Sequence, residues 1–444
     1  MPALPTLESI AGCRIGILGF GREGRSALKA LRACNRELDV TILTESGPVE
    51  VDDAALRVGP FDERLAEFPV LLRSPGIPVS HPALERARSA GSLIVNPATL
   101  WLSERGAHLP VIGVTGSKGK STTASLLAHL LRARGQRVIL AGNIGVPLLD
   151  HLSTPADIAV VELSSYQLAD LAGRLDIGIV TRLFPEHIDW HGSQAAYFAS
   201  KLRIVELLEG RPLIVNASDD CLMRETAGVA GRLAGNRPPA PYRRGDVLIV
   251  GQECTVAPGS LALRGRHNLD NSALALQAAM LLGHPAEALV DALRDFCPLP
   301  HRLERIADQC GVSWVNDSIA TSPYATLAAL EAIADGPVVL IVGGKDRPAD
   351  WSPVMDWIRH HGLSGLIGIP DNGPAVVECC RQQAGDRCAR LARADSLESA
   401  VRLAAEWSRP GDTVVLSPGA PSFPRFRDFE HRGEVFRLAV AGLR

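Results

Sequence analysis

Short runs of aliphatic and β-branched residues alternate along this chain with longer segments in which apolar residues recur at helical spacing. Strands that alternate with helices in this way predict parallel β-sheets covered by helices. We therefore predict an α/β fold along the whole chain. The runs with strand character are residues 14–18, 40–43, 70–72, 93–95, 111–115, 137–140, 158–163, 177–181, 213–216, 313–315, 337–344, 366–369 and 412–416.

Two interruptions divide this pattern. It loosens around residues 104–109, just before a second strand and turn begin at Val111, and Pro298-Leu299-Pro300 breaks it again. A chain of 444 residues has room for two to four domains of roughly 100–200 residues each. We predict three domains, at residues 1–108, 109–299 and 300–444.

The segment from Val111 to Thr122 has the layout of a phosphate-binding loop. An apolar strand leads through a glycine-rich turn into Lys120-Ser121 and a helical run. The glycines allow backbone N–H groups to converge on phosphate oxygens, the lysine and the helix N-terminus favour negative charge, and the serine hydroxyl can reach Mg²⁺. The strict G-x-x-x-x-G-K-[ST] pattern is missed at one position, because Val114 stands where its first glycine belongs.

A turn without a ligand is the alternative for this segment. The agreement of strand, glycines, lysine and helix favours a nucleoside triphosphate. The candidate residues are Gly116, Ser117, Lys118, Gly119, Lys120, Ser121 and Thr122.

A second glycine-rich turn, Gly19-Phe20-Gly21-Arg22-Glu23-Gly24, follows the first predicted strand and matches G-x-G-x-x-G. Such turns bind dinucleotides, with an acidic residue about 20 positions further on for the ribose, and Glu45 lies near that place. A dehydrogenase is one interpretation, but nothing later in the chain is typical of a hydride-transfer site. We favour a nucleotide that carries a diphosphate, and a tight turn without a ligand stays open.

Acidic and imidazole side chains follow two strands of the second domain. Glu162 closes the strand at 158–163, and His187 and Asp189 follow the strand at 177–181. Ligands bind at the carboxyl ends of parallel strands, and a carboxylate there suits Mg²⁺, so Glu162 is a candidate metal ligand. For His187 and Asp189, a metal or phosphate network and a polar surface loop both stay open. Lys201, judged only by its place in a helix, is interpreted as a solvated side chain.

The strands of the third domain end in polar or glycine-rich loops. Residues 316–318, 343–347 and 417–423 each follow a predicted strand, which predicts a small-molecule pocket where these loops meet. Arg302, at the domain boundary, is placed either to reach phosphates across a cleft or to form a hinge ion pair.

The overall charge argues against nucleic acid or a membrane surface as a partner. Lysine and arginine number 46 against 49 acidic residues, which gives a formal net charge of −3. No apolar run is as long as a membrane span, and the N-terminus does not resemble a signal peptide. Nine scattered cysteines without metal-ligand spacing are typical of free thiols in a reducing compartment. We therefore expect a cytoplasmic protein without membrane insertion.

Together these motifs resemble those of the Mur ligases of bacterial peptidoglycan synthesis, and most closely the members that add glutamate to UDP-N-acetylmuramoyl-L-alanine. The resemblance covers essentially the whole chain, and the motifs are far more specific together than singly. They are residues 19–24, 74–77, 113–122, 142–145, 162–168, His187 with Asp189, 201–203, 265–268 with Asn271, 301–302, 316–318, 343–344, 416–418 and 429–433.

The resemblance implies a role for each domain. Residues 1–108 would be a Rossmann-like domain for the UDP-sugar, 109–299 a P-loop ATPase domain with a parallel sheet, and 300–444 a Rossmann-like domain for the amino acid. ATP would phosphorylate the substrate carboxylate to an acyl phosphate, which the amine of glutamate attacks with release of phosphate. The cofactors would be ATP and two Mg²⁺ ions, and the enzyme a cytoplasmic monomer. Such chemistry depends on charge clamps and positioning.

The resemblance also assigns roles to individual residues. Lys201 would be carbamylated, so that added CO₂ turns a cation into a carboxylate-like metal ligand. The catalytic residues would be Lys120, His187 and Lys201, and the metal ligands Ser121, Glu162, His187 and Lys201. Besides the phosphate loop, ATP would contact Asn268, Asn271, Arg302 and Asp317. The UDP substrate would contact Gly19, Phe20, Gly21, Arg22, Ser74, Pro75, Gly76 and Asn143, and the amino acid Thr321, Arg347, Ser422 and Phe429.

Departures from the D-glutamate ligases concentrate in the predicted amino-acid pocket. Ile319 stands where those enzymes have a lysine, and Arg347 stands where they have a second one. Before His187, Arg182 and Glu186 replace an asparagine and an aspartate. Inversion of an α-carbon exchanges the directions of amine and carboxylate, so the cation that meets the carboxylate must move. We therefore favour the related branch that adds L-glutamate, with D-glutamate as the alternative.

Two other functions are weighed against this one. Folylpolyglutamate synthetases share the ATPase domain and the last domain but lack a UDP-binding first domain, so residues 1–108 argue against them. A nucleotide sensor that descends from a ligase without catalysis is disfavoured, because the catalytic and metal-binding candidates are retained.

Overall fold

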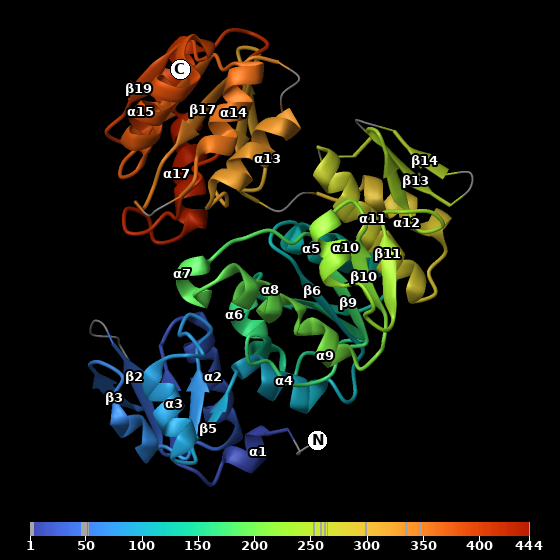
Figure 1. Cartoon of the computed structure of the whole chain (residues 1–444), viewed down its shortest axis with the longest axis vertical. Coiled ribbons are helices and arrows are strands. Elements are labelled where there is room, and N and C mark those ends of the chain that lie inside the picture. Colours follow the sequence, from blue (N-terminus) through green and yellow to red (C-terminus); the bar gives the residue numbers. More distant parts are fainter. Residues whose placement is uncertain are drawn as a thin grey trace. The chain divides into compact units, whose positions relative to one another are not determined.

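The computed structural model describes residues 4–45, 51, 53–251, 254–257, 260–261, 263, 265–297, 300–333, 336–346 and 349–443. Three parallel or mostly parallel sheets flanked by helices dominate this part of the chain, as Figure 1 shows in blue, in teal to green and in orange to red. The predicted α/β fold is confirmed. Within these residues, no helix combines the length and the apolar character that crossing a membrane requires.

The first sheet contains five parallel strands in the order β3-β2-β1-β4-β5. They are β1 (Ile15–Leu18), β2 (Val40–Thr44), β3 (Ala55–Val58), β4 (Val70–Arg73) and β5 (Leu93–Val95). The accompanying helices are α1 (Leu7–Ile10), α2 (Arg22–Cys34), η1 (Glu63–Glu67), α3 (Pro82–Ser89) and α4 (Pro97–Arg105). The sequence analysis predicts all of these strands except β3, whose mostly exposed side chains at the sheet edge give no apolar run. Because β1 lies between β2 and β4, the turn after β1 occupies the point where strand order reverses, which is where such sheets bind ligands.

The second sheet contains six parallel strands in the order β11-β10-β9-β6-β8-β7. They are β6 (Val111–Thr115), β7 (Val138–Gly142), β8 (Ile158–Glu162), β9 (Ile177–Val180), β10 (Leu213–Asn216) and β11 (Arg232–Gly235). Since β6 pairs with both β8 and β9, the loops that follow these three strands meet at one edge. A small antiparallel sheet follows, with β12 (Tyr242–Arg244), β13 (Val247–Val250) and β14 (Cys254–Val256).

The helices of this region are short except for two. They are α5 (Lys120–Ala133), η2 (Leu148–His151), α6 (Ser165–Leu168), α7 (Ile188–His191), α8 (Gln194–Leu202), α9 (Ile204–Leu208), α10 (Asp220–Glu225), α11 (Arg266–Leu281) and α12 (Ala286–Arg294). The pattern predicts one helix from 194 to 209, but the structure interrupts it at Arg203. The guanidinium of Arg203 donates hydrogen bonds to the carbonyls of Leu168 and Leu171, contacts that local periodicity does not reveal.

The third sheet contains six strands in the order β15-β16-β20-β17-β18-β19, of which β15 is antiparallel to β16 and the rest are parallel. They are β15 (Glu304–Gln309), β16 (Val312–Asn316), β17 (Val338–Val342), β18 (Gly365–Gly368), β19 (Leu391–Arg393) and β20 (Thr413–Leu416). The helices are α13 (Pro323–Ile333), α14 (Ser352–His361), α15 (Gly373–Ala384), η3 (Gly385–Arg387), α16 (Leu397–Trp407) and α17 (Phe429–Ala441).

Buried apolar residues show which sheets share a core. One cluster runs from Ile17 of β1 through Trp101 of α4 to Val161 of β8, so it joins the first and second sheets. Two further clusters cover the third sheet and draw their buried members from residues 312–440 alone. The chain accordingly divides into two compact units, Met1–Pro258 with Leu269–Asp295, and Gly259–Asn268 with Phe296–Arg444. The predicted boundaries near 108 and 299 stay predictions.

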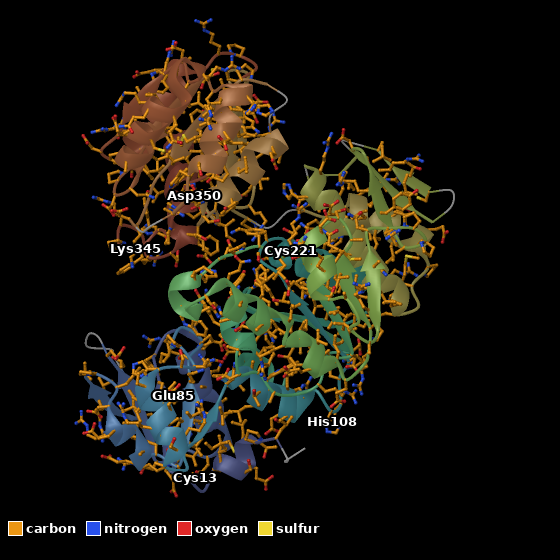
Figure 2. All side chains as sticks on the ribbon, viewed as in Figure 1. Cys13, Glu85, His108, Cys221, Lys345 and Asp350 are labelled. Atoms are coloured by element: carbon orange, nitrogen blue, oxygen red, sulfur yellow. The ribbon has the colours of Figure 1, made fainter. Side chains whose placement is uncertain are left out.

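The nine cysteines are free thiols, as expected. Cys13 and Cys221, labelled in Figure 2, lie on separate parts of the chain.

Candidate active site

The phosphate loop joins β6 to the first residue of α5, Lys120. Gly116 and Gly119 have φ values of +142° and +92°, a region that favours glycine. A Cβ at Gly116 would lie 2.1 Å from Thr181 Oγ1, and one at Gly119 would lie 2.4 Å from Asn271 Oδ1 on α11. The loop therefore needs glycine for its conformation and for its close neighbours. It ends at the N-terminus of a 14-residue helix, an arrangement that binds anions.

Ser117 fixes the loop to the structure beneath it. Its N–H donates to the carbonyl of Arg182 at 2.7 Å, and its hydroxyl donates to the carbonyl of Phe184, also at 2.7 Å. Tyr197 OH lies 2.9 Å from the same hydroxyl. The side chain of Ser117 thus holds the loop in place. Tyr197, a buried residue of α8, is a supporting residue that the sequence analysis does not identify.

Two lysines of the loop differ in their surroundings. The ammonium of Lys120 donates to the carbonyl of Ser117 at 3.1 Å, so the charge lies over the loop itself. Lys118 forms an ion pair with Glu186 at 3.2 Å. Asn271 lies against Gly119, and Asn268 lies one turn earlier on the same helix. Ser121 and Thr122 follow in the first turn of α5.

Glu162 closes β8 beside the loop and is 1% exposed. Its Oε1 accepts a hydrogen bond of 2.7 Å from Asn143 Nδ2, whereas its buried Oε2 has no hydrogen-bond partner among the described residues. A buried carboxylate oxygen without a partner is costly, and a hard cation such as Mg²⁺ would satisfy it. The residue therefore fits the predicted metal role. Asn143, predicted on the substrate side, is placed here as the partner of Glu162.

His187 and Lys201 lie close to these groups. His187 is the N-cap of α7 and has a left-handed backbone conformation at φ 55°. Burial lowers the pKa of His187 to about 4, although the negative charge of Glu186 acts to raise it. Lys201, on α8, is 2% exposed, with Nζ 4.9 Å from the centre of the Tyr197 ring. Burial, together with the charge of Lys120, holds the pKa of Lys201 well below its usual range, although Glu186 and Glu162 oppose this. The interpretation of Lys201 as a solvated residue is wrong.

The described residues contain no group of three or more histidine, cysteine, aspartate and glutamate side chains arranged to hold a metal ion. The side chain of Asp189 lies outside the described residues, so its predicted part in this site stays untested.

The predicted UDP-binding segments adjoin each other at the edge of the first sheet. Gly19 has φ +80°, and a Cβ at Gly24 would lie 2.2 Å from the Gly19 carbonyl, so α2 starts close against the strand. Ser74 Oγ donates to the same carbonyl at 3.1 Å. Arg22 reaches the carbonyl of Gly145 at 3.5 Å, in the loop that also carries Asn143. The Gly19–Gly24 turn, the loop that carries Asn143 and Gly145, and the Ser74-Pro75-Gly76 loop therefore form one region.

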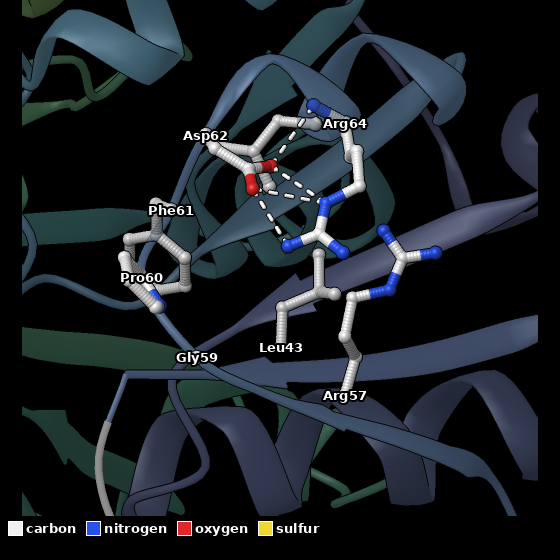
Figure 3. Close-up of a pocket in the computed structure, with 8 residues that line it drawn as sticks. Leu43, Arg57, Gly59, Pro60, Phe61, Asp62 and Arg64 are labelled. Carbon is white, nitrogen blue, oxygen red and sulfur yellow. Dashed lines mark hydrogen bonds and ion pairs between the residues drawn. The ribbon is translucent and has the colours of Figure 1, made fainter.

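A pocket lies beside this edge, where β2 and β3 end (Figure 3). Leu43, Arg57, Pro60 and Phe61 line it, and the carboxylate of Asp62 holds Arg64 through several hydrogen bonds. Glu45, the acid considered for a ribose, accepts a hydrogen bond of 3.3 Å from the N–H of Phe61.

The candidates of the third sheet gather around a buried arginine. Asp317 accepts hydrogen bonds from Ser417 Oγ at 2.8 Å and from Leu303 N at 3.2 Å, next to Arg302. Arg432 of α17 is fully buried and donates to the carbonyls of Ser318 and Ala420 at 2.7 and 3.0 Å. Burial lowers its pKa to about 9.

Arg432 Nη1 also donates to the carbonyl of Gly343 at 3.5 Å, so Arg432 ties together the loops after β16, β17 and β20, the three loops predicted to form a pocket. Its carbonyl-rich surroundings were not foreseen from the sequence. Phe429 begins α17, and its carbonyl accepts from Ser318 Oγ at 2.8 Å. Ser422 is buried in the loop after β20, and Thr321 lies just before α13. Arg347 lies outside the described residues.

Known proteins are similar to this chain in sequence. Residues 114–279 match the Mur ligase middle domain, and residues 301–419 match the Mur ligase glutamate ligase domain. A UDP-N-acetylmuramoyl-L-alanine–L-glutamate ligase from Micromonospora sp. is 39% identical, over 98% of this chain and 98% of its own length. A ligase of the same name from Xanthomonas oryzae pv. oryzae is 39% identical, over 97% of this chain and 95% of its own length.

Solved structures share the fold. A MurF ligase from Thermotoga maritima in complex with ADP superposes with a TM-score of 0.61 at 18% identity, covering 96% of this chain and 95% of its own. A pseudomurein peptide ligase type C from Methanothermus fervidus gives 0.58 at 16% identity, over 96% and 99%.

Proposed function

The chain belongs to the Mur ligase family, and from that premise we propose that it uses ATP to join L-glutamate to UDP-N-acetylmuramoyl-L-alanine. It is an ATP-dependent ligase of peptidoglycan synthesis that adds glutamate. Similarity over nearly the full length to ligases named for L-glutamate is the observation that supports this isomer. The departures at Ile319 and Arg347 from the D-glutamate pattern agree with it.

In the proposed reaction, a carboxylate oxygen of the UDP substrate attacks the γ-phosphorus of ATP, and the bond to ADP breaks. The amine of glutamate then attacks the acyl carbon, loses a proton, and expels inorganic phosphate. The loop N–H groups and Lys120 would hold the phosphates and counter the charge that moves from one oxygen to another. Because the enzyme forms no covalent bond in this scheme, its contribution is positioning and charge.

Mg²⁺ would bind at Glu162, Ser121 and His187, where it would neutralise phosphate charge. Burial lowers the pKa of Lys201 and so favours the uncharged amine, which is the form that reacts with CO₂. The product carbamate would be an anionic oxygen ligand. The negative charge of a carbamate would also attract Lys120, whereas an ammonium group on Lys201 repels it. We propose that Lys201 is carbamylated and that two ions bind.

The amino acid would occupy the loops that Arg432 supports. Thr321, Ser422 and Phe429 are the residues proposed to contact it, and Arg347 is the cation proposed for its carboxylate. Arg302 and Asp317 are proposed to grip ATP. The UDP group is proposed to lie along the Gly19–Gly24 turn and the Ser74 loop. We also propose that the protein is a cytoplasmic monomer and binds no nucleic acid.

Phosphate release tests this function. Purified protein with ATP, Mg²⁺ and UDP-N-acetylmuramoyl-L-alanine should release phosphate with L-glutamate at a rate at least tenfold above that with D-glutamate. Each amino acid is also tested without the UDP substrate, to measure background ATP hydrolysis. Preference for D-glutamate would reverse the assignment of the isomer alone. Absence of turnover with any amino acid would remove the proposed function and favour a nucleotide-binding protein without catalysis.

A further inference from the structure

A fully buried arginine joins the first sheet to the segment that follows Glu162. Arg73, the last residue of β4, is 0% exposed. Its Nε and Nη2 donate to the two carboxylate oxygens of Asp170 at 2.7 and 2.6 Å, a bidentate pair. Nη2 also donates to the carbonyl of Tyr166 at 3.1 Å. A desolvated guanidinium with this geometry holds both partners in one orientation.

The same guanidinium also organises the loop that follows Arg73. Nη1 donates to the carbonyls of Ser74, Pro75 and Ile77 at 3.3, 3.2 and 2.5 Å. These residues form the loop proposed to contact the UDP substrate. One side chain therefore fixes the shape of the loop and, through Asp170, its position relative to the second sheet.

Further contacts support this junction. Asn96 Nδ2 donates to Asp170 Oδ1 at 2.9 Å and to the carbonyl of Gln167 at 2.8 Å. Gln167 Nε2 in turn donates to Glu23 Oε1 at 3.2 Å, in the glycine turn after β1. In the segment that carries His187, Trp190 Nε1 donates to the carbonyl of Gly76 at 3.0 Å. Both proposed UDP-binding loops are thus bonded to the segments that carry Glu162 and His187.

We propose that Arg73 and Asp170 are positioning residues, which set the distance between the carboxylate of the UDP substrate and the γ-phosphate of ATP. The inference rests on the proposed function. Neither residue needs to touch a substrate. Each tethers a loop that does, and a misplacement of about 1 Å at the reacting atoms lowers a rate by roughly 100-fold. The sequence conceals this pair, because its members are 97 positions apart in different predicted domains.

Arg73→Lys tests the proposal, since lysine keeps the charge but cannot bridge Asp170 and four carbonyls at once. Asp170→Asn tests the other member of the pair, whose side chain is partly exposed. The matched control is Asp157→Asn, which breaks the exposed pair between Arg137 and Asp157, with Nη2 and Oδ1 2.6 Å apart. For each variant, calorimetry gives the Kd of the UDP substrate alone and of the ATP analogue AMP-PNP with Mg²⁺ alone, and phosphate release gives kcat.

We expect both variants at the junction to bind each ligand within about threefold of the wild type while kcat falls roughly 100-fold, and the control to keep its kcat. The double variant should be no slower than the slower single variant, because the pair acts as a unit. An unchanged kcat in Asp170→Asn, or single effects that multiply in the double variant, would overturn the proposal. A wild type that never turns over would instead refute the proposed function, so the two failures are distinguishable.

Discussion

At the scale of single residues, burial decides the chemistry of Lys201. A lysine on a short helix is ordinarily a solvated cation, but Lys201 is 2% exposed, and burial together with the charge of Lys120 disfavours its ammonium form. We expect Lys201→Ala to lose at least 100-fold in kcat, because the oxygen ligand that the proposed carbamate would supply is missing. Added short carboxylates, such as formate or acetate, should restore part of the activity by taking its place. Phosphate release measured against carboxylate concentration checks this.

Lys120→Ala provides the control for that experiment. This variant removes a cation, so an added carboxylate should not restore its activity. Recovery in both variants, or in neither, would count against a carbamate at Lys201.

Glu23 shows a second effect of burial. Burial raises its pKa from 4.5 to about 7, while Gln167 and Arg22 act in the opposite direction. The folded state therefore holds a proton between pH 4.5 and 7 that the unfolded state has lost, and stability falls as the pH rises through this range. At ~1.4 kcal/mol per tenfold change in a protonation equilibrium, the loss is about 3 kcal/mol above pH 7.

Glu23→Gln should remove this dependence. We expect it to raise the denaturant midpoint relative to the wild type at pH 8 and to change it little at pH 4.5. The comparison is Glu85→Gln, at an exposed position on α3 that Figure 2 labels. An equal effect of Glu23→Gln at both pH values would show that Glu23 ionises normally in the folded protein.

At the scale of elements, the turn between β6 and α5 has both a conformational and a steric requirement. Gly119→Ala places a methyl group at φ +92°, 2.4 Å from Asn271 Oδ1, so the side chain of Asn271 must move away from the phosphate loop. We expect a loss of stability of about 1–2 kcal/mol and an increase in the KM for ATP of at least tenfold. Denaturant unfolding and steady-state kinetics measure the two effects.

Gly135, just beyond the C-terminal end of α5, has the conformational requirement for glycine without the steric one. It has φ +82°, and a Cβ there meets nothing within 4 Å. Gly135→Ala should therefore lose a similar amount of stability and keep its KM for ATP. If Gly119→Ala and Gly135→Ala raise the KM for ATP equally, the contact between residue 119 and Asn271 does not determine ATP binding.

At the scale of the whole molecule, the distribution of core residues predicts which pieces fold by themselves. The buried clusters of the third sheet contain Trp314 and Phe436 and draw no buried member from earlier in the chain. The core of the first sheet instead continues into the second through Trp101 and Leu109. We expect a fragment of residues 301–444 to unfold cooperatively, and a fragment of residues 1–108 to expose apolar surface and aggregate.

Circular dichroism melting of the two fragments checks this expectation. A cooperative transition for residues 1–108 would show that the first sheet is an independent domain despite the shared core. Trp314→Ala in the longer fragment should lower its midpoint, because it removes a fully buried ring.

The parts of the site that could be predicted are those whose chemistry lies within one short segment. Gly116, Gly119 and Lys120 form a loop between a strand and a helix, and local pattern is enough to recognise such a loop. Glu162 was predicted because it ends an apolar run. Lys201 was misjudged from local pattern, since its burial depends on Tyr197 and on loops from other strands. Arg73 gives no signal in the sequence, and Arg432 appears only as part of the 429–433 motif without a role, because each is satisfied by carbonyls and side chains from distant loops.

The sequence by itself determined the alternation of strands and helices, the two glycine turns and the candidate metal ligand, because backbone preferences and apolar periodicity act over a few residues. Only the tertiary structure decided which charges lie out of water and which loops are bonded together. Strand order brings the ends of β6 and β8 to one edge, and burial there lowers the pKa of Lys201 well below its usual range. Solvation and long-range pairing are properties of the folded chain, so no local pattern contains them.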